Sequence, residues 1–270
     1  MSTGRVAVIQ FPGVNCEAES VRALERVGLE AEVFRWTRDV DELARFDAYL
    51  LPGGWSYQDR VRAGALAAKD PLVEVLATEA DGGKPVIGIC NGAQVLVEAG
   101  LVPDPDGTVG LALARNRMAD RGGYFARWIR VRVEDSPCVF TKHLEPGTVV
   151  PLPIAHGEGR FTCADPERME SLVRAGQVPL RYASATGAVA EDFPDNPNGA
   201  EQSAAAVCNR RGNVLAIMPH PERAQDLGGL SRTIGGAWGE RRDEALVSHR
   251  LDAEGPGLTF FHGLRRHLEG

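Results

Sequence analysis

Short apolar runs alternate with stretches of helical spacing along the first half of the chain. The strands predicted from the apolar runs are residues 5–11, 31–36, 46–51 and 85–89. The helices predicted from apolar residues three or four apart are residues 16–27, 65–80 and 93–101. Strands that alternate with helices predict an α/β fold, with a mostly parallel central sheet and helices on both faces. Functional groups are then expected at the carboxyl ends of the strands.

The second half of the chain is richer in strands. The further strands predicted there are residues 124–134, 147–154, 178–183, 203–208 and 213–218. Residues 209–212 have the composition of a hairpin turn, and residues 258–268 have the spacing of a closing helix. Residues 224–257 are Gly-rich and polar with weak periodicity, which predicts a long loop or an insertion. Because no linker or internal repeat divides the chain, we expect residues 1–270 to form a single domain.

Composition excludes several classes of protein. The chain has 270 residues with 30 Lys+Arg and 37 Asp+Glu, and its net charge of −7 gives no basic surface for nucleic acid or an anionic membrane. No apolar run approaches the ~20 residues of a membrane span, and the N-terminus has no signal-peptide pattern. The cysteines at positions 16, 90, 138, 163 and 208 have no CxxC spacing, so we expect no zinc site. A cytoplasmic protein with free thiols fits this pattern.

The strongest local feature is Gly88-Ile89-Cys90-Asn91-Gly92, between a predicted strand and a predicted helix. This is the arrangement of a nucleophile elbow with Cys in place of Ser. Glycines on both sides allow a sharp turn, and the positive end of the following helix faces the nucleophile. The backbone N–H after Cys90 points toward a developing oxyanion. Taken alone, the motif also fits a structural cysteine on a tight turn.

A thiol nucleophile needs a base and a group that orients the base. The segment Pro219-His220-Pro221-Glu222 follows a strongly apolar predicted strand. Two residues apart in an extended segment, His220 and Glu222 point to the same side. The prolines stiffen the segment and reduce the entropy lost when His220 is held in place. A triad of Cys90, His220 and Glu222 is therefore favoured over a structural histidine at a strand end.

Pro52-Gly53-Gly54 ends another predicted strand. Adjacent glycines free backbone N–H groups and let a ligand approach closely. In a parallel sheet this turn can lie beside Cys90 and donate a second hydrogen bond to an oxyanion. The same composition also suits an ordinary turn. This segment therefore indicates an oxyanion hole only in combination with the segments of Cys90 and His220.

Together these three segments resemble the signatures of the class I (triad-type) glutamine amidotransferases, which have a flavodoxin-like fold. Five further segments narrow the resemblance to the glutaminase subunits of phosphoribosylformylglycinamidine synthase, a family of the purine pathway. These segments are Phe11-Pro12-Gly13-Val14-Asn15-Cys16, Ser56-Tyr57 with Arg62-Ala63-Gly64-Ala65, Ala155-His156-Gly157-Glu158-Gly159-Arg160-Phe161, Asn196-Pro197-Asn198-Gly199 and Met218-Pro219-His220-Pro221-Glu222-Arg223. The resemblance runs from residue 5 to residue 223.

The resemblance implies a particular chemistry for these residues. Cys90 would attack the side-chain amide of L-glutamine and form a thioester, His220 would relay protons, and Glu222 would orient His220. Backbone N–H groups of Gly54 and Asn91 would form the oxyanion hole. The resemblance further implies that Gly53 and Gln94 bind the substrate, and that His156 binds the substrate or meets the synthetase. Gln94 lies one turn into the predicted helix, where a side chain faces the site.

The resemblance also implies partners. Ammonia would pass to a large synthetase subunit that converts formylglycinamide ribonucleotide to formylglycinamidine ribonucleotide with ATP and Mg. A small third subunit would complete the enzyme, and this chain itself would hold no cofactor and no metal. Cys16 begins a predicted helix but has no assigned His–Glu pair, so we interpret it as structural. Arg223 could pair with Glu222 or with the synthetase.

Three other functions share part of this pattern. A class I glutaminase that serves another synthetase would keep the elbow and the triad, but the segment of residues 155–160 argues against it. A non-catalytic subunit on the same fold should lack Cys90, His220 or Glu222. A single-chain cysteine hydrolase or chaperone would not need the segment of residues 196–199. Residues 224–257 could cover the site, contact the synthetase or simply loop out.

Overall fold

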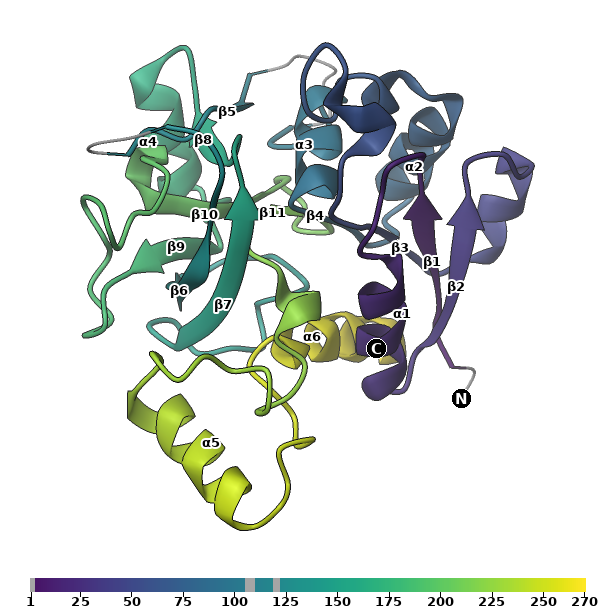
Figure 1. Cartoon of the computed structure of the whole chain (residues 1–270). Coiled ribbons are helices and arrows are strands. Elements are labelled where there is room, and N and C mark those ends of the chain that lie inside the picture. Colours follow the sequence, from purple (N-terminus) through teal and green to yellow (C-terminus); the bar gives the residue numbers. More distant parts are fainter. Residues whose placement is uncertain (1–2, 105–109, 119–121) are drawn as a thin grey trace.

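In the part of the chain that the structure describes, nine strands form one sheet at the centre of the molecule (Figure 1). The computed structural model describes residues 3–104, 110–118 and 122–270. The strands follow the order β2-β1-β3-β4-β11-β10-β9-β6-β7 across the sheet. In chain order, their bounds are Arg5–Gln10 (β1), Glu30–Arg35 (β2), Ala48–Leu51 (β3), Val86–Ile89 (β4), Phe125–Val133 (β6), Val149–His156 (β7), Leu180–Ala183 (β9), Ala204–Cys208 (β10) and Val214–Ile217 (β11).

Seven of these nine strands run in one direction. β2, β1, β3, β4 and β11 form a continuous parallel block, whereas every later neighbouring pair is antiparallel. Only β10 and β6 therefore point the other way, and the predicted fold with a mostly parallel sheet is confirmed. The predicted hairpin turn at residues 209–212 joins β10 to β11.

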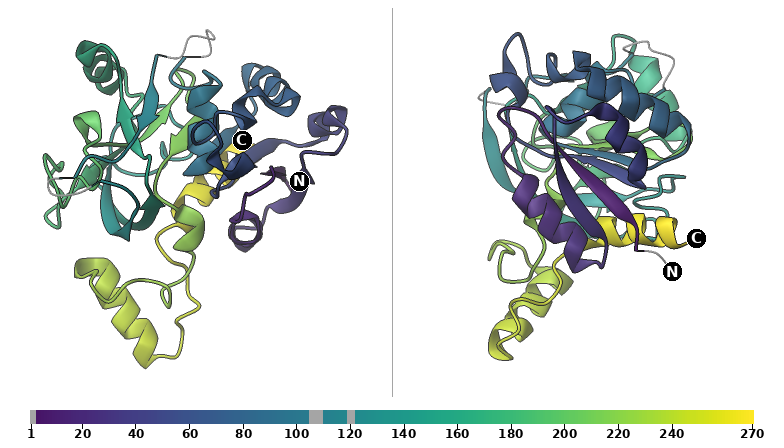
Figure 2. Two further views of the ribbon diagram at one scale, coloured as in Figure 1. Left: turned by 45° about the horizontal axis from the view of Figure 1, so that its top comes forward. Right: turned by 90° about the vertical axis from the view of Figure 1, so that its right-hand side faces the viewer.

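Helices cover both faces of the parallel block. The turned views in Figure 2 place α2 (Pro71–Asp81) and α3 (Asn91–Glu98) on one side of the sheet, and α1 (Glu17–Arg26) with α6 (Leu258–Glu269) on the other. α1 contacts β1, β2 and α6, while α3 packs on β4 and β11. The predicted layers are confirmed, and the predicted closing helix corresponds to α6.

Burial explains the two kinds of strand sequence. Every residue of β3, β4 and β11 is buried, because helices cover both faces there and a continuous apolar run is required. β6 alternates instead, with Ile129, Val131 and Val133 buried and the arginines between them half-buried. The candidate site is therefore carried at the carboxyl ends of three strands that are buried along their whole length.

Residues 224–257 contain a helix that the sequence pattern does not predict. α5 (Gly236–Val247) lies in an arm that projects from the body of the molecule (Figures 1 and 2). Within α5 only Gly239 and Ala245 are buried, so the helix has no broad apolar stripe to reveal it. The prediction of a loop is wrong for this helix, and an insertion at residues 224–257 stays a prediction.

Proline begins two helices instead of interrupting them. The helix predicted over residues 65–80 starts only at Pro71, where the Asp70 carboxylate accepts a hydrogen bond from the Leu72 N–H. α4 (Pro166–Arg174), which the periodicity does not predict, starts in the same way after Asp165. A separate two-stranded sheet pairs β5 (Ala112–Ala114) with β8 (Arg160–Thr162). Among the described helices, none combines the length and apolar character needed to span a bilayer.

Candidate active site

The carboxyl ends of three neighbouring strands meet at one edge of the parallel block. β3 is followed by Gly53 and Gly54, β4 by Cys90, and β11 by His220. Parallel strands end on the same edge, so these segments, far apart in the sequence, become neighbours. Gly54, Cys90 and His220 line one cavity of about 300 Å³. The structure thus brings together the three segments that the sequence singles out.

Cys90 lies on a strained turn between β4 and α3. Its φ of +51° is unusual for a residue with a side chain. The turn needs the flanking glycines: a Cβ on Gly92 would lie 2.0 Å from the Leu51 carbonyl oxygen, and one on Gly88 would lie 2.4 Å from the Gly92 oxygen. The Cys90 N–H donates to the Ile217 oxygen (2.8 Å), which ties the turn to β11. This is the geometry of a nucleophile elbow.

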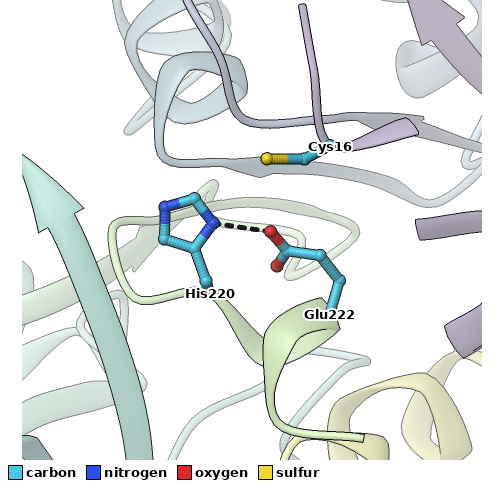
Figure 3. Close-up of side chains that lie close together, drawn as sticks. All are labelled: Cys16, His220 and Glu222. Atoms are coloured by element: carbon cyan, nitrogen blue, oxygen red, sulfur yellow. Dashed lines mark hydrogen bonds and ion pairs between the residues drawn. The ribbon is translucent and has the colours of Figure 1, made fainter. Parts of the chain in front are cut away.

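His220 and Glu222 form a buried pair. His220 Nδ1 lies 2.5 Å from Glu222 Oε1 (Figure 3), and both side chains are almost fully buried. Burial by itself lowers the pKa of His220, but the Glu222 carboxylate and the Cys90 sulfur outweigh it, so the pKa lies well above its ordinary value. In the described part of the chain Nε2 has no hydrogen-bond partner. The ring can therefore hold a proton and exchange it with a group in the cavity.

The Gly53-Gly54 turn faces the same histidine. A Cβ on Gly53 would lie 2.7 Å from His220 Cε1, so only glycine allows this approach. Gly54 has φ +143° and forms an isolated antiparallel bridge with Val14, in which the Trp55 N–H donates to the Gly13 oxygen. No backbone partner of the Gly54 N–H is present in the described residues. This N–H is available to an oxyanion at the cavity.

The side chains of Asn91 and Gln94 connect α3 to two loops around the cavity. Asn91 Oδ1 accepts from the Ser56 N–H (2.9 Å), and its Nδ2 donates to Gln94 Oε1 (2.9 Å) and to Asp59 (3.2 Å). Gln94 Nε2 donates to the Glu158 carbonyl oxygen (2.6 Å). Gln94 is consequently held against the cavity wall and does not lie on a solvated helix face.

His156 is fully buried and held in one tautomer. Asn116 Nδ2 donates to the carbonyl oxygens of His156 (2.8 Å) and Gly123 (3.1 Å), which leaves Asn116 Oδ1 as an acceptor. His156 Nδ1, 3.1 Å from that oxygen, therefore carries the hydrogen. Burial and the charge of His220 lower the pKa of His156 to about 3. The ring is neutral, and Nε2, without a partner in the described chain, is an acceptor.

Cys16 lies beside the His220–Glu222 pair, a position that the sequence pattern does not predict. Its Sγ lies within 4.8 Å of the ligand atoms of His220 and Glu222 (Figure 3). These are residue types that bind zinc. However, Arg223 Nη2 donates to Cys16 Sγ (3.0 Å), and a guanidinium at that position disfavours a divalent cation. The available signal was topological: Cys16 follows β1, which pairs with β3.

Comparison with known proteins identifies relatives of this chain. A family model for the CobB/CobQ-like glutamine amidotransferase domain matches residues 3–246. Phosphoribosylformylglycinamidine synthase subunit PurQ of Methanothrix thermoacetophila is 43% identical over 272 residues, 98% of each chain. The subunit PurQ of Thermomicrobium roseum is 44% identical over 92% of this chain and 97% of the relative. In the structure of PurLQS from Thermotoga maritima, one chain matches with a TM-score of 0.67 at 32% identity, covering 92% of this chain and 99% of that chain.

A parallel-sheet fold with a cysteine elbow and a family match over most of the chain define the class: this protein is a glutamine amidotransferase of the CobB/CobQ-like family. Within that class the chain belongs to the PurQ family, the glutaminase subunits of phosphoribosylformylglycinamidine synthase in purine biosynthesis. The resemblance carried by the sequence motifs is thereby confirmed.

Proposed function

We propose that this chain hydrolyses L-glutamine at Cys90 and supplies the ammonia to a partner synthetase. The observation that carries the proposal is the placement of Cys90, on a strained elbow, in one cavity with the buried His220–Glu222 pair. A nucleophile, a base and a group that orients the base are the parts that acyl transfer to sulfur requires. The identity to PurQ subunits supports glutamine as the acyl donor.

The reaction has two halves. The Cys90 thiolate forms a bond to the amide carbon of glutamine, and the carbonyl electron pair moves to oxygen. The N–H groups of Gly54 and Asn91 stabilise that oxyanion, and protonated His220 gives its proton to the leaving nitrogen, so that ammonia departs and a thioester remains. Water then attacks the thioester carbon while His220 accepts a proton from it. Glutamate leaves and the thiolate is restored, so one glutamine and one water give one glutamate and one ammonia.

Three further residues hold the substrate in this proposal. Gly53 leaves room for the amide beside His220, because any side chain there would fill that space. Gln94 is fixed by Asn91 and the Glu158 carbonyl and lines the cavity near the N-terminus of α3. His156 lines the cavity as a neutral ring and offers an acceptor for an N–H group of the substrate.

The ammonia is consumed by a partner. The name PurLQS of the Thermotoga maritima structure supports partner subunits for this chain as well, for which we propose a large synthetase subunit and a small third subunit. The synthetase would bind ATP and Mg and convert formylglycinamide ribonucleotide to formylglycinamidine ribonucleotide, with no cofactor in the present chain. A biosynthetic role of this kind supports the predicted cytoplasmic location.

The proposal is tested by labelling the full chain, alone and with its synthetase, with an electrophilic glutamine analogue. We expect one adduct on Cys90 by peptide mass spectrometry, blocked by excess L-glutamine and absent from the Cys90→Ala variant. Glutamine labelled with ¹⁵N at the side-chain amide should transfer the label to the ribonucleotide product in the complex. An adduct on Cys16 in place of Cys90, or protection by ligands other than glutamine, would refute the assignment.

A further inference from the structure

Asp59 brings a carboxylate into the cavity that holds Cys90. It ends the short helical turn of residues 56–59, which follows the Gly53-Gly54 segment. The side chain lines the cavity together with Cys90 and Gln94. Neither the proposed hydrolysis nor the oxyanion hole uses this carboxylate, and the sequence motifs do not single it out.

The backbone around Asp59 is strained, and the side chain is held in place. Tyr57, Gln58 and Asp59 have φ values of 53°, 60° and 51°, so three successive residues with side chains adopt the left-handed conformation. Such conformations cost free energy and persist where surrounding contacts impose them. Here Asn91 Nδ2 donates to Asp59 Oδ1 (3.2 Å), and Asn91 Oδ1 holds the Ser56 N–H at the start of the turn.

The Asp59 carboxylate has an acidic neighbour, and no described cation lies within ion-pair distance of it, although Arg62, Arg115 and Arg223 line the same cavity. Among the described residues it takes part in no ion pair, whereas nearby Glu158 is paired with Arg115 (3.6 Å). Burial, with the Glu158 charge as the next cause, raises the pKa of Asp59 to about 6. At neutral pH the group is therefore largely an anion in a half-buried place, and a positively charged ligand group would relieve the cost of that burial.

L-Glutamine carries such a group. Its reacting amide must lie at Cys90, and the other end of the molecule has an α-ammonium at neutral pH. We propose that Asp59 binds the α-ammonium of glutamine and so selects α-amino acid amides over amides that lack this group. The inference rests on the proposed function, because it takes the substrate to be an amide that reacts at Cys90. Asp59 is then a specificity-determining residue and takes no part in bond making.

The test uses two substrates that differ only in the α-ammonium. The full chain in complex with its synthetase is assayed for ammonia release with L-glutamine and with glutaramate as substrates. Glutaramate is also tested as a competitive inhibitor of glutamine hydrolysis. A charge-assisted hydrogen bond predicts that the wild type prefers glutamine by about 10- to 150-fold in kcat/KM, and more where Gln94 also contributes. Asp59→Asn should lower kcat/KM for glutamine by about that factor and change the values for glutaramate less than about threefold.

Asp59→Asn is nearly isosteric and keeps an oxygen for Asn91 Nδ2, so it should fold as the wild type does. Glu158→Gln is the matched variant, because it neutralises a second carboxylate of the same cavity that already has a cation. An equal loss for both substrates in Asp59→Asn, or loss of discrimination in Glu158→Gln alone, would overturn the inference. Absence of any glutaminase activity in the wild-type complex would instead refute the proposed function, so the two failures are distinct.

Discussion

Replacing Glu222 with Gln removes the negative charge that faces His220 and keeps the shape of the side chain. Glu222 is fully buried, and its Oε1 lies 2.5 Å from His220 Nδ1. A hydrogen bond to a charged group contributes about 1.5–3 kcal/mol, which corresponds to a loss of roughly 10- to 150-fold in kcat/KM. We expect the loss mainly in kcat, because Glu222 acts on His220 and has no contact with the substrate in the proposed mechanism.

The same substitution should move the pH profile in a defined direction. In the wild type, Glu222 and Cys90 outweigh burial and raise the pKa of His220. The proposed mechanism needs His220 protonated so that it can release ammonia, and activity therefore falls at high pH as the ring loses its proton. Without the carboxylate, burial is opposed less strongly and the pKa falls. The alkaline limb of kcat/KM should then shift to lower pH in Glu222→Gln.

The assay measures glutamate formation by the complex over a series of buffers from acidic to alkaline pH. Glu254→Gln is the matched control, since it breaks a second His–Glu pair, His262–Glu254 (3.0 Å), that lies at the surface. We expect the control to keep the wild-type kcat/KM and profile. A Glu222→Gln variant with wild-type kcat and an unmoved alkaline limb would show that the buried pair has no role in proton transfer.

Three further substitutions have expected outcomes. Cys16→Ser removes a sulfur that helps to raise the pKa of His220, so the alkaline limb should shift slightly to lower pH while the glutamine analogue still labels Cys90. Gly92→Ala places a Cβ 2.0 Å from the Leu51 oxygen, and the displaced elbow should lose about 100-fold in kcat, whereas retained activity would contradict the packing. Because burial lowers the pKa of His156 to about 3, the unfolded chain binds a proton there near pH 6.5 and the folded chain does not. The free energy of unfolding should therefore fall by up to about 1.4 kcal/mol per pH unit below pH 6.5, and urea titrations of His156→Gln should show a flatter dependence.

The sequence pattern is sufficient to predict the structure wherever the environment of a residue is set by its near neighbours. β3 and β4 are buried on both faces, so their apolar runs are continuous and easily recognised. The elbow at Cys90 was recognisable because its glycines are required by contacts within five residues and with β3. α5 escaped prediction for the opposite reason, since an arm that projects from the body needs only a narrow apolar contact.

The rest of the site depends on contacts between residues far apart in the chain. Cys16 comes to His220 only because β1 pairs with β3, and no periodicity encodes that strand order. Asn116 fixes the tautomer of His156 from a segment 40 residues away. The proposed role of Asp59 can be inferred only from the cavity that it lines. Residue type and spacing can therefore predict the nucleophile and its base, but not the side chains that tune them.

Asn91 links the two ends of the proposed substrate site. Its backbone N–H is the candidate oxyanion donor next to Cys90, and its side chain holds both Asp59 and Gln94. Under the proposed roles, one residue thus fixes the separation between the group that stabilises the reacting amide and the group that binds the α-ammonium. If these roles hold, asparagine, which is one methylene shorter than glutamine, should not reach Cys90 and Asp59 at the same time. A rigid network of this kind would select substrates by their length without any further contact to the substrate. The reason is that hydrogen bonds formed before the substrate binds already offset the conformational strain of the turn at Asp59.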